Sequence, residues 1–309
     1  MNSQFTITLI GSEVPQDAIL ALRQLSTQKT EQNRIMELGQ TTCLSSGEKL
    51  AIQAYRVECN LPIQTNTDHL KQALAAYSEE WQIDAVLQAD TEEKIGLACF
   101  DMDSTLIKAE VIDLLAEHAG VEEQVSSITE RAMQGELDFK QSFSERMKLL
   151  ENSDASVMSG IAKSLPIMDG AERLFKNLKK HNIYTAILSG GFDYFAKHLQ
   201  QKFEINSVLA NTLEITSGRL SGRAITPIID AEQKKNELIK LTQERNLRPT
   251  MTMAVGDGAN DIEMLNCAGL GVAYKAKPIV QSQASAALNY NSLDALLFLI
   301  GFNEKDITA

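Results

Sequence analysis

Hydrophobic and polar residues follow short, regular patterns along most of the chain, and the period of the pattern changes from segment to segment. Alternation with a period of two predicts a strand, whereas apolar residues three and four positions apart predict one face of a helix. In the first 90 residues the patterns predict the order strand, helix, strand, strand, helix, strand. These elements are expected at residues 5–12, 15–28, 34–41, 51–60, 68–81 and 83–90.

This βαββαβ order is that of the α+β ferredoxin-like fold, to which the small amino-acid-sensing ACT domains belong. We therefore expect an ACT-like domain over residues 1–92, followed by a short linker. The sequence leaves two roles open for it. The domain could bind a small amino acid as a regulatory ligand, or it could only brace the rest of the chain or form a homodimer, because no glycine-rich ligand turn decides between them.

From residue 95 to residue 309, strands alternate with helices, which predicts an α/β domain with a doubly wound, Rossmann-like parallel sheet. A hairpin is expected at residues 208–225 and a terminal amphipathic helix at residues 292–302. Several amphipathic helices interrupt the alternation between about residues 110 and 166. They predict a helical insertion into the sheet domain.

Two carboxylates stand at the end of the first strand of this second part. The segment GLACFDMDSTLI places Asp101 and Asp103 two residues apart after an apolar run. Such side chains share one face of a strand end, and parallel sheets bind ligands at the carboxyl ends of their strands. Two acids this close repel each other unless a cation lies near them. The pair therefore predicts Mg²⁺ as well as catalysis.

Two distant segments also carry polar residues directly after an apolar run. The segment TMAVGDGANDIEML passes from an apolar strand into a turn with Asp257, Asn260 and Asp261, where flanking glycines allow a tight backbone turn. The segment YTAILSGGF ends its apolar run at Ser189 and Gly190, before a helical stretch. A hydroxyl and free N–H groups at a helix start suit a phosphate group.

The order of these motifs, DxDxT, SGG, a lysine and GDGxxD, resembles the haloacid dehalogenase superfamily of phosphotransferases. Within that superfamily, the segments DMDST and GDGANDIEML, the glutamate seven residues after Asp103, and residues 133–150 are similar to the phosphoserine phosphatases. The resemblance covers roughly residues 95–300. It implies Mg²⁺-dependent hydrolysis of O-phospho-L-serine to L-serine and phosphate, the last step of serine biosynthesis.

The motif residues receive expected roles in this reaction. Asp101 is expected to be the nucleophile that forms an aspartyl-phosphate. Asp103 is expected to protonate the leaving serine and then to deprotonate the attacking water. In the superfamily the dehalogenases lack this second acid and the ion pumps carry threonine, so Asp103 favours hydrolysis. The Asp101 carboxylate, the Asp103 backbone carbonyl and Asp257 are expected to hold Mg²⁺, with Asp261 orienting them, although an all-oxygen site also accepts Mn²⁺ or Co²⁺.

The resemblance also implies which groups bind the phosphoryl oxygens. The expected donors are Ser189, Gly190 and Lys234, and Asn260 is counted among the substrate-binding residues. Lys235 is adjacent to Lys234 in the segment DAEQKKNEL. The distance to the GDG turn favours Lys234, and the other lysine is then a surface residue.

The resemblance implies that the helical insertion at about residues 110–166 is a small cap. Substrate choice is expected from this cap, which would exclude water when it closes. Glu110 suits the ammonium group of phosphoserine, and Arg146 suits its carboxylate through paired hydrogen bonds. Phe139 is expected beside them, and Met133 on the wall of the same site. Alone, a glutamate such as Glu110 more often makes a favourable contact at a helix start, and an arginine such as Arg146 more often lies on a solvated helix face. A phenylalanine such as Phe139 is more often a core residue. Only their joint spacing points to a substrate site.

Other activities fit the same residues. A phosphotransferase that passes phosphate from phosphoserine to a hydroxyl such as that of homoserine would share nearly all of them, as would a phosphatase for another small phosphate ester. A serine-sensing regulator with an inactive catalytic half is a third alternative. The presence of every catalytic residue argues against this regulator.

Composition sets further limits. A chain of 309 residues with 44% hydrophobic residues can bury two cores. No apolar run reaches the ~20 residues that span a bilayer, and no basic segment precedes the first apolar stretch, so we expect a cytoplasmic protein. The four cysteines form no CxxC pair, which suits a reducing compartment without disulfides. The net charge of −12 disfavours nucleic acid and anionic membranes as partners.

Overall fold

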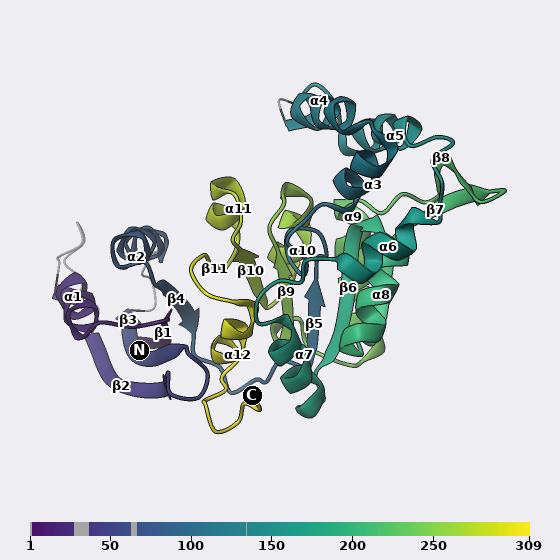
Figure 1. Ribbon diagram of the computed structural model, residues 1–309. Helices are drawn as coiled ribbons and strands as arrows, with labels where there is room; N and C mark the ends of the chain where they lie inside the picture. The colour runs from purple at the N-terminus through teal and green to yellow at the C-terminus, as the bar shows by residue number, and fades with distance from the viewer. Residues whose placement is uncertain (1, 28–36, 63–66, 134) are drawn as a thin grey trace.

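A computed structural model describes residues 2–27, 37–62, 67–133 and 135–309, and these residues form two sheets (Figure 1). The first sheet is antiparallel, has four strands in the order β2-β3-β1-β4, and carries two helices. This arrangement confirms the ferredoxin-like βαββαβ order. Its elements are β1 (Asn2–Gly11), α1 (Gln16–Thr27), β2 (Glu37–Ser46), β3 (Gln53–Pro62), α2 (Asp68–Trp81) and β4 (Asp84–Ala89).

The strand β2 differs most from expectation. It was expected at residues 34–41, of which residues 34–36 lie outside the described part of the chain, and it continues to Ser46. Two register shifts interrupt its pairing with β3. Because such irregularities break the period-two pattern of apolar residues, the second half of the strand has no clear signal in the sequence.

The second sheet has seven strands in the order β11-β10-β9-β5-β6-β7-β8 and is parallel except for the β7–β8 hairpin. Every residue of β5, β9 and β10 is buried, as expected for parallel strands with both faces covered. The strands are β5 (Leu97–Phe100), β6 (Tyr184–Phe192), β7 (Ser207–Thr216), β8 (Arg219–Ile225), β9 (Thr252–Gly256), β10 (Leu270–Tyr274) and β11 (Ala286–Leu288). The helices beside them are α7 (Ala171–Lys180), α8 (Asp193–Phe203), α9 (Ala231–Glu244), α10 (Ile262–Cys267) and α11 (Pro278–Gln283). This is the predicted doubly wound α/β fold.

Four helices form a cap at one end of this sheet, at the upper right of Figure 1. They are α3 (Val111–Ala119), α4 (Glu122–Met133), α5 (Phe139–Leu149) and α6 (Val157–Ser164). The chain enters and leaves the cap through two segments that are bridged at Ile107 and Ile167. The β7–β8 hairpin supports the cap from the side, because Leu220 exchanges backbone hydrogen bonds with Asn152 and Ser153.

The end of the chain lies between the two sheets (Figure 1). An amphipathic helix was expected at residues 292–302, and the helical segment found there is shorter and has no exposed face. A short 3-10 turn at Leu293–Ala295 leads into α12 (Leu296–Leu299), and all of these residues are buried. The helix-free face of the first sheet covers the side of α12 that would otherwise meet solvent, since Ile10, Ala54 and Val86 of that sheet share one apolar cluster with α12.

A buried carboxylate forms hydrogen bonds between the first sheet and the segment that follows β11. Asp84, at the start of β4, is 1% exposed and accepts hydrogen bonds from the Asn289 N–H at 2.6 Å and the Asn291 side chain at 2.7 Å. The Asn291 side chain also donates to the carbonyl of Ile10 at 2.9 Å. These bonds satisfy polar groups that the apolar contact would otherwise bury unpaired.

We expect Asp84→Ala to lower the free energy of unfolding by about 3 kcal/mol, because it leaves several buried donors without an acceptor. Urea denaturation followed by circular dichroism measures this change. Asp90→Ala, which removes an exposed carboxylate just after the same strand, is the matched control and should change the value by less than about 0.5 kcal/mol. Equal stability of the two variants would contradict this account of the contact.

Candidate active site

A buried lysine lies at the centre of the site. Lys234, in the first turn of α9, is 0% exposed, and its Nζ lies 2.8 Å from Asp101 Oδ1 and 2.8 Å from Asp261 Oδ1. Burial by itself would lower the pKa of Lys234, but the two carboxylates outweigh this effect and raise it. Lys235 is partly exposed and pairs with Glu263 on the surface. Of the two adjacent lysines, the structure therefore brings only Lys234 to the predicted site.

Three carboxylates converge beside this lysine. Asp101 follows β5 and Asp257 follows β9, the neighbouring strand, so both lie at the carboxyl edge of the sheet. One oxygen atom from each of Asp101, Asp257 and Asp261 lies within 4.8 Å of the others. Burial, Asp101 and Asp261 raise the pKa of Asp257 to about 8. A single lysine does not neutralise three acids, and this set of oxygen atoms fits a hard divalent cation.

The three carboxylates differ in how many of their oxygens accept hydrogen bonds from the protein. Asp261 accepts from Lys234 through Oδ1 and from the Gly258 N–H, at 3.0 Å, through Oδ2. Asp257 accepts from the Thr105 hydroxyl at 3.1 Å through Oδ1. Since both oxygens of Asp261 are engaged by protein donors, Asp101 and Asp257 are better placed to bind a cation directly.

The positions before and after Asp257 require glycine for a different reason from the one expected. The sequence suggested a tight backbone turn, but Gly256 and Gly258 are outside the positive-φ region. A Cβ atom at Gly256 would instead collide with the carboxylate of Asp261. Similarly, a Cβ at Gly191 would collide with Asp103 Oδ2. These positions need glycine because the carboxylates of Asp261 and Asp103 occupy the space beside the backbone.

Asp103 faces both residues 189–191, the turn expected to bind phosphate, and the cap. Its Oδ1 accepts the N–H of Val111, at 2.8 Å, at the start of α3, whereas Oδ2 lies against Gly191. Burial, followed by the charges of Glu110 and Asp101, raises the pKa of Asp103 well above its usual range. A carboxyl group with a raised pKa is suited to giving and taking a proton.

The expected phosphate-binding residues lie across from these acids. Ser189 is fully buried, and its Oγ accepts the N–H of Gly191 at 2.9 Å. The position of a Cβ on Gly190 would lie 3.1 Å from Phe139 Cζ and 3.6 Å from Asn260 Nδ2. The turn, the cap and the GDG segment therefore meet at Gly190, and the aromatic cluster of Phe139, Phe143 and Phe192 holds α5 of the cap against β6.

The cap residues expected to recognise the substrate lie on the same side. Arg146 is half-buried, and burial lowers its pKa while the charges of Glu110, Asp113 and Asp103 act against this effect. Part of Glu110 reaches solvent, yet the surrounding protein desolvates its carboxylate and raises its pKa. Glu110 and Arg146 are thus electrostatically coupled to each other and to the acids of the site. Met133 ends α4, but its side chain lies outside the described part of the structure.

Two supporting residues were missed by the sequence reasoning. The Ser104 hydroxyl donates to Glu110 Oε1 at 2.7 Å, and the backbone of Ser104 has a φ of +56°. The Thr105 hydroxyl donates to Asp257, as described above. Both follow Asp103 directly in the DMDST motif, which was the available signal. Their roles depend on contacts with residues 6 and 152 positions away, and spacing alone does not reveal such contacts.

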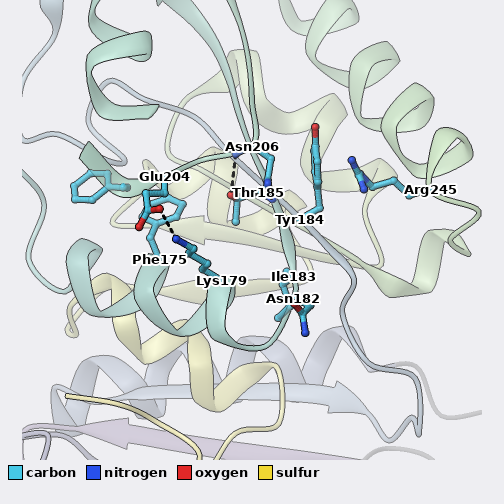
Figure 2. A pocket seen from close by; sticks show the side chains of 10 residues that line it. Phe175, Lys179, Asn182, Ile183, Tyr184, Thr185, Glu204, Asn206 and Arg245 are labelled. Carbon is cyan, nitrogen blue, oxygen red and sulfur yellow. Dashed lines mark hydrogen bonds and ion pairs between the residues drawn. The ribbon is translucent and has the colours of Figure 1, made fainter. Parts of the chain in front are cut away.

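A separate cavity of about 450 Å³ lies at the other end of β6 (Figure 2). Its lining includes Tyr184, which begins the strand, and Arg245, whose guanidinium carbon lies 3.1 Å from the centre of the Tyr184 ring. The Lys179–Glu204 ion pair lies on its other side. Since Ser189 and the acids belong to the carboxyl edge of the sheet, this cavity is distinct from the predicted site.

Comparison with known proteins identifies relatives for both parts of the chain. The model of the haloacid dehalogenase-like hydrolases matches residues 95–269. The phosphoserine phosphatase of Saccharomyces cerevisiae is 36% identical over 312 residues, covering 99% of this chain and 98% of that protein. The phosphoserine phosphatase of Streptomyces coelicolor is 40% identical over 245 residues, which cover 79% of this chain and 60% of that longer protein.

A solved structure has the same overall arrangement. The haloacid dehalogenase family hydrolase t0658 of Salmonella enterica serovar Typhi superposes with a TM-score of 0.83 at 30% identity, covering 97% of this chain and 99% of that one. In the described part of this chain, no helix is long and apolar enough to cross a membrane. The motif order, the acidic site and these relatives together show that the chain belongs to the phosphoserine phosphatases of the haloacid dehalogenase-like hydrolase family.

Proposed function

We propose that the chain hydrolyses O-phospho-L-serine to L-serine and phosphate through an aspartyl-phosphate on Asp101, with Mg²⁺ as its cation. The observation that carries this proposal is the buried Lys234, which bridges Asp101 and Asp261 beside Asp257. This constellation holds a nucleophile, a cation site and a fixed positive charge at one point. Phosphoryl transfer needs little else besides positioning and charge stabilisation.

The first step forms a bond between a carboxylate oxygen of Asp101 and phosphorus, while the bond from phosphorus to the serine oxygen breaks. Lys234, the Ser189 hydroxyl and the turn at Gly190 stabilise the charge on the phosphoryl oxygens. Asn260, whose side chain approaches Gly190, contributes to the same binding site. These donors are held by the fold before the substrate arrives, so little reorganisation is needed in the transition state.

Asp103 serves both half-reactions. It donates a proton to the departing serine oxygen, and it then takes a proton from the water that attacks the phosphorus of the aspartyl-phosphate. Its raised pKa and the position of Oδ2 against Gly191 support this role. The water step breaks the bond between phosphorus and Asp101, which releases phosphate and regenerates the free carboxylate.

Mg²⁺ would be held by the Asp101 carboxylate, the Asp103 backbone carbonyl and Asp257, with Asp261 orienting Lys234 and the turn. When bound, the ion supplies positive charge that offsets the crowded carboxylates and the phosphoryl oxygens. The convergence of the acids within 4.8 Å supports a divalent cation at this place.

The cap, which we place at about residues 110–166 of a catalytic domain spanning 95–309, selects the substrate. Glu110 would bind the ammonium group, Arg146 the carboxylate, and Phe139 would exclude water from the reacting bonds. Met133 stays a prediction for the wall of this site. The contact of Phe139 with Gly190 supports a cap that closes directly over the phosphate.

A homodimer through the amino-terminal domain of residues 1–92 stays a prediction, as does the cytoplasmic location. The helix-free face of the first sheet is covered by the chain itself. A second copy would therefore bind to the helical face or to the edge of β2.

We expect Lys234→Met to reduce kcat for L-phosphoserine at least 10²-fold, because a fixed charge facing the transferring phosphoryl group is lost. Lys235→Met is the matched control and should retain kcat within about twofold, since its ion pair with Glu263 is on the surface. Phosphate release measures kcat, and thermal unfolding verifies that both variants fold. Similar kcat values for two folded variants would count against the proposed role of Lys234.

We expect Arg146→Ala to reduce kcat/KM for L-phosphoserine about 10²-fold, because the substrate carboxylate loses its charged partner. O-Phosphoethanolamine has the ammonium group but no carboxylate, so its kcat/KM should fall less than about threefold. Arg131→Ala is the control in the same cap, because Arg131 pairs with Glu136 and Glu145 on the surface. An equal loss for both esters would show that Arg146 does not recognise the carboxylate.

A further inference from the structure

The phosphate-binding turn is a bulge whose backbone is held by a side chain without an assigned role. β6 pairs with β7 on both sides of residues 189–191, but there three residues of β6 lie opposite one residue of β7. A bulge removes backbone groups from the regular ladder, and they need other partners. The side-chain amide of Asn211, in β7, donates to the carbonyl of Gly190 at 2.8 Å.

The same amide reaches a second element of the site. Asn211 is 1% exposed, and its Oδ1 accepts the N–H of Ile229 at 2.8 Å. Ile229 precedes Asp230, whose carboxylate accepts the Gln233 N–H at 3.1 Å at the start of α9. That helix carries Lys234 in its first turn. One buried side chain therefore ties the phosphate-binding turn to the start of the lysine helix.

The bond to Gly190 also has a consequence for the Ser189 hydroxyl. The Gly190 carbonyl and the Gly191 N–H belong to one planar peptide unit. With its carbonyl end bound to Asn211, the opposite end of this unit donates to Ser189 Oγ at 2.9 Å. This bond occupies an acceptor position of the hydroxyl, so its proton remains for a phosphoryl oxygen.

We propose that Asn211 is a positioning residue for phosphoryl transfer: it orients the Ser189 hydroxyl through the Gly190–Gly191 peptide and fixes the start of the helix that carries Lys234. The inference rests on the proposed function, since it assigns the orientation of the same phosphate donors. Donors that are preorganised toward the transition state affect kcat more than KM.

The test uses the full-length protein with Asn211→Asp, whose ionised carboxylate keeps an acceptor for the Ile229 N–H but cannot donate to the Gly190 carbonyl. We measure kcat and KM for L-phosphoserine and the inhibition constant of orthovanadate, whose equatorial oxygens mimic the transferring phosphoryl group. We expect kcat to fall about tenfold, the inhibition constant to rise about tenfold, and KM to stay within about threefold. Asn211→Ala, which brings no charge into the interior, gives the same readouts if the aspartate variant does not fold.

The matched control is Thr212→Val, on the same strand. It removes a hydrogen bond of 3.0 Å from Thr212 to Asp193, which does not reach the phosphate-binding turn. All three constants should stay within about twofold of the wild-type values. If the Asn211 variants lower the melting temperature but match Thr212→Val in kcat and orthovanadate inhibition, the amide is only structural and the inference is overturned.

Failure of the proposed substrate has a different signature. If the wild-type protein hydrolyses another small phosphate ester but not L-phosphoserine, the substrate assignment is wrong. The same variants measured with that ester still test Asn211, because the phosphate donors do not depend on the leaving group.

Discussion

The arrangement of the site depends on the electrostatic free energy that it costs to bury several carboxylates close together. Asp101, Asp257 and Asp261 converge at the carboxyl edge of the sheet, and Lys234 is the charged side chain that joins two of them. Without compensating charge, such a cluster would keep its protons, and Asp101 could not act as the proposed nucleophile. The fold supplies part of this charge through a lysine that is itself fully buried, and the remaining imbalance creates the affinity for a divalent cation.

Other features of the fold keep this cluster in place. Glycine at positions 191 and 256 leaves room for the carboxylates of Asp103 and Asp261. The start of α3 donates to Asp103, so the cap and the proposed acid are positioned together. The amino-terminal sheet covers α12, and Asp84 of that sheet accepts hydrogen bonds from Asn289 and Asn291 of the second part. The first domain is thus bound into the core of the enzyme and contributes to its stability.

The fold class and most residues of the site could be predicted from the sequence, because the signals for them lie in short, continuous segments. Apolar runs revealed the parallel strands. Asp101 and Asp257 follow such strands directly, and Ser189 lies near the carboxyl end of β6, so their meeting at one edge was foreseeable. The burial of α12 was not foreseeable, because its second apolar face meets a sheet from the other end of the chain. The role of Gly256 and the contacts of Asn211 likewise depend on distances that a linear pattern does not contain.

The central claim is that Asp101 carries the phosphoryl group during turnover. The most direct test is rapid acid quenching of the enzyme with Mg²⁺ and ³²P-labelled L-phosphoserine, followed by mapping of the labelled peptide. The account predicts label on Asp101, no label in Asp101→Asn, and none when a chelator removes the metal. Label on another residue, or full turnover by Asp101→Asn, would contradict it.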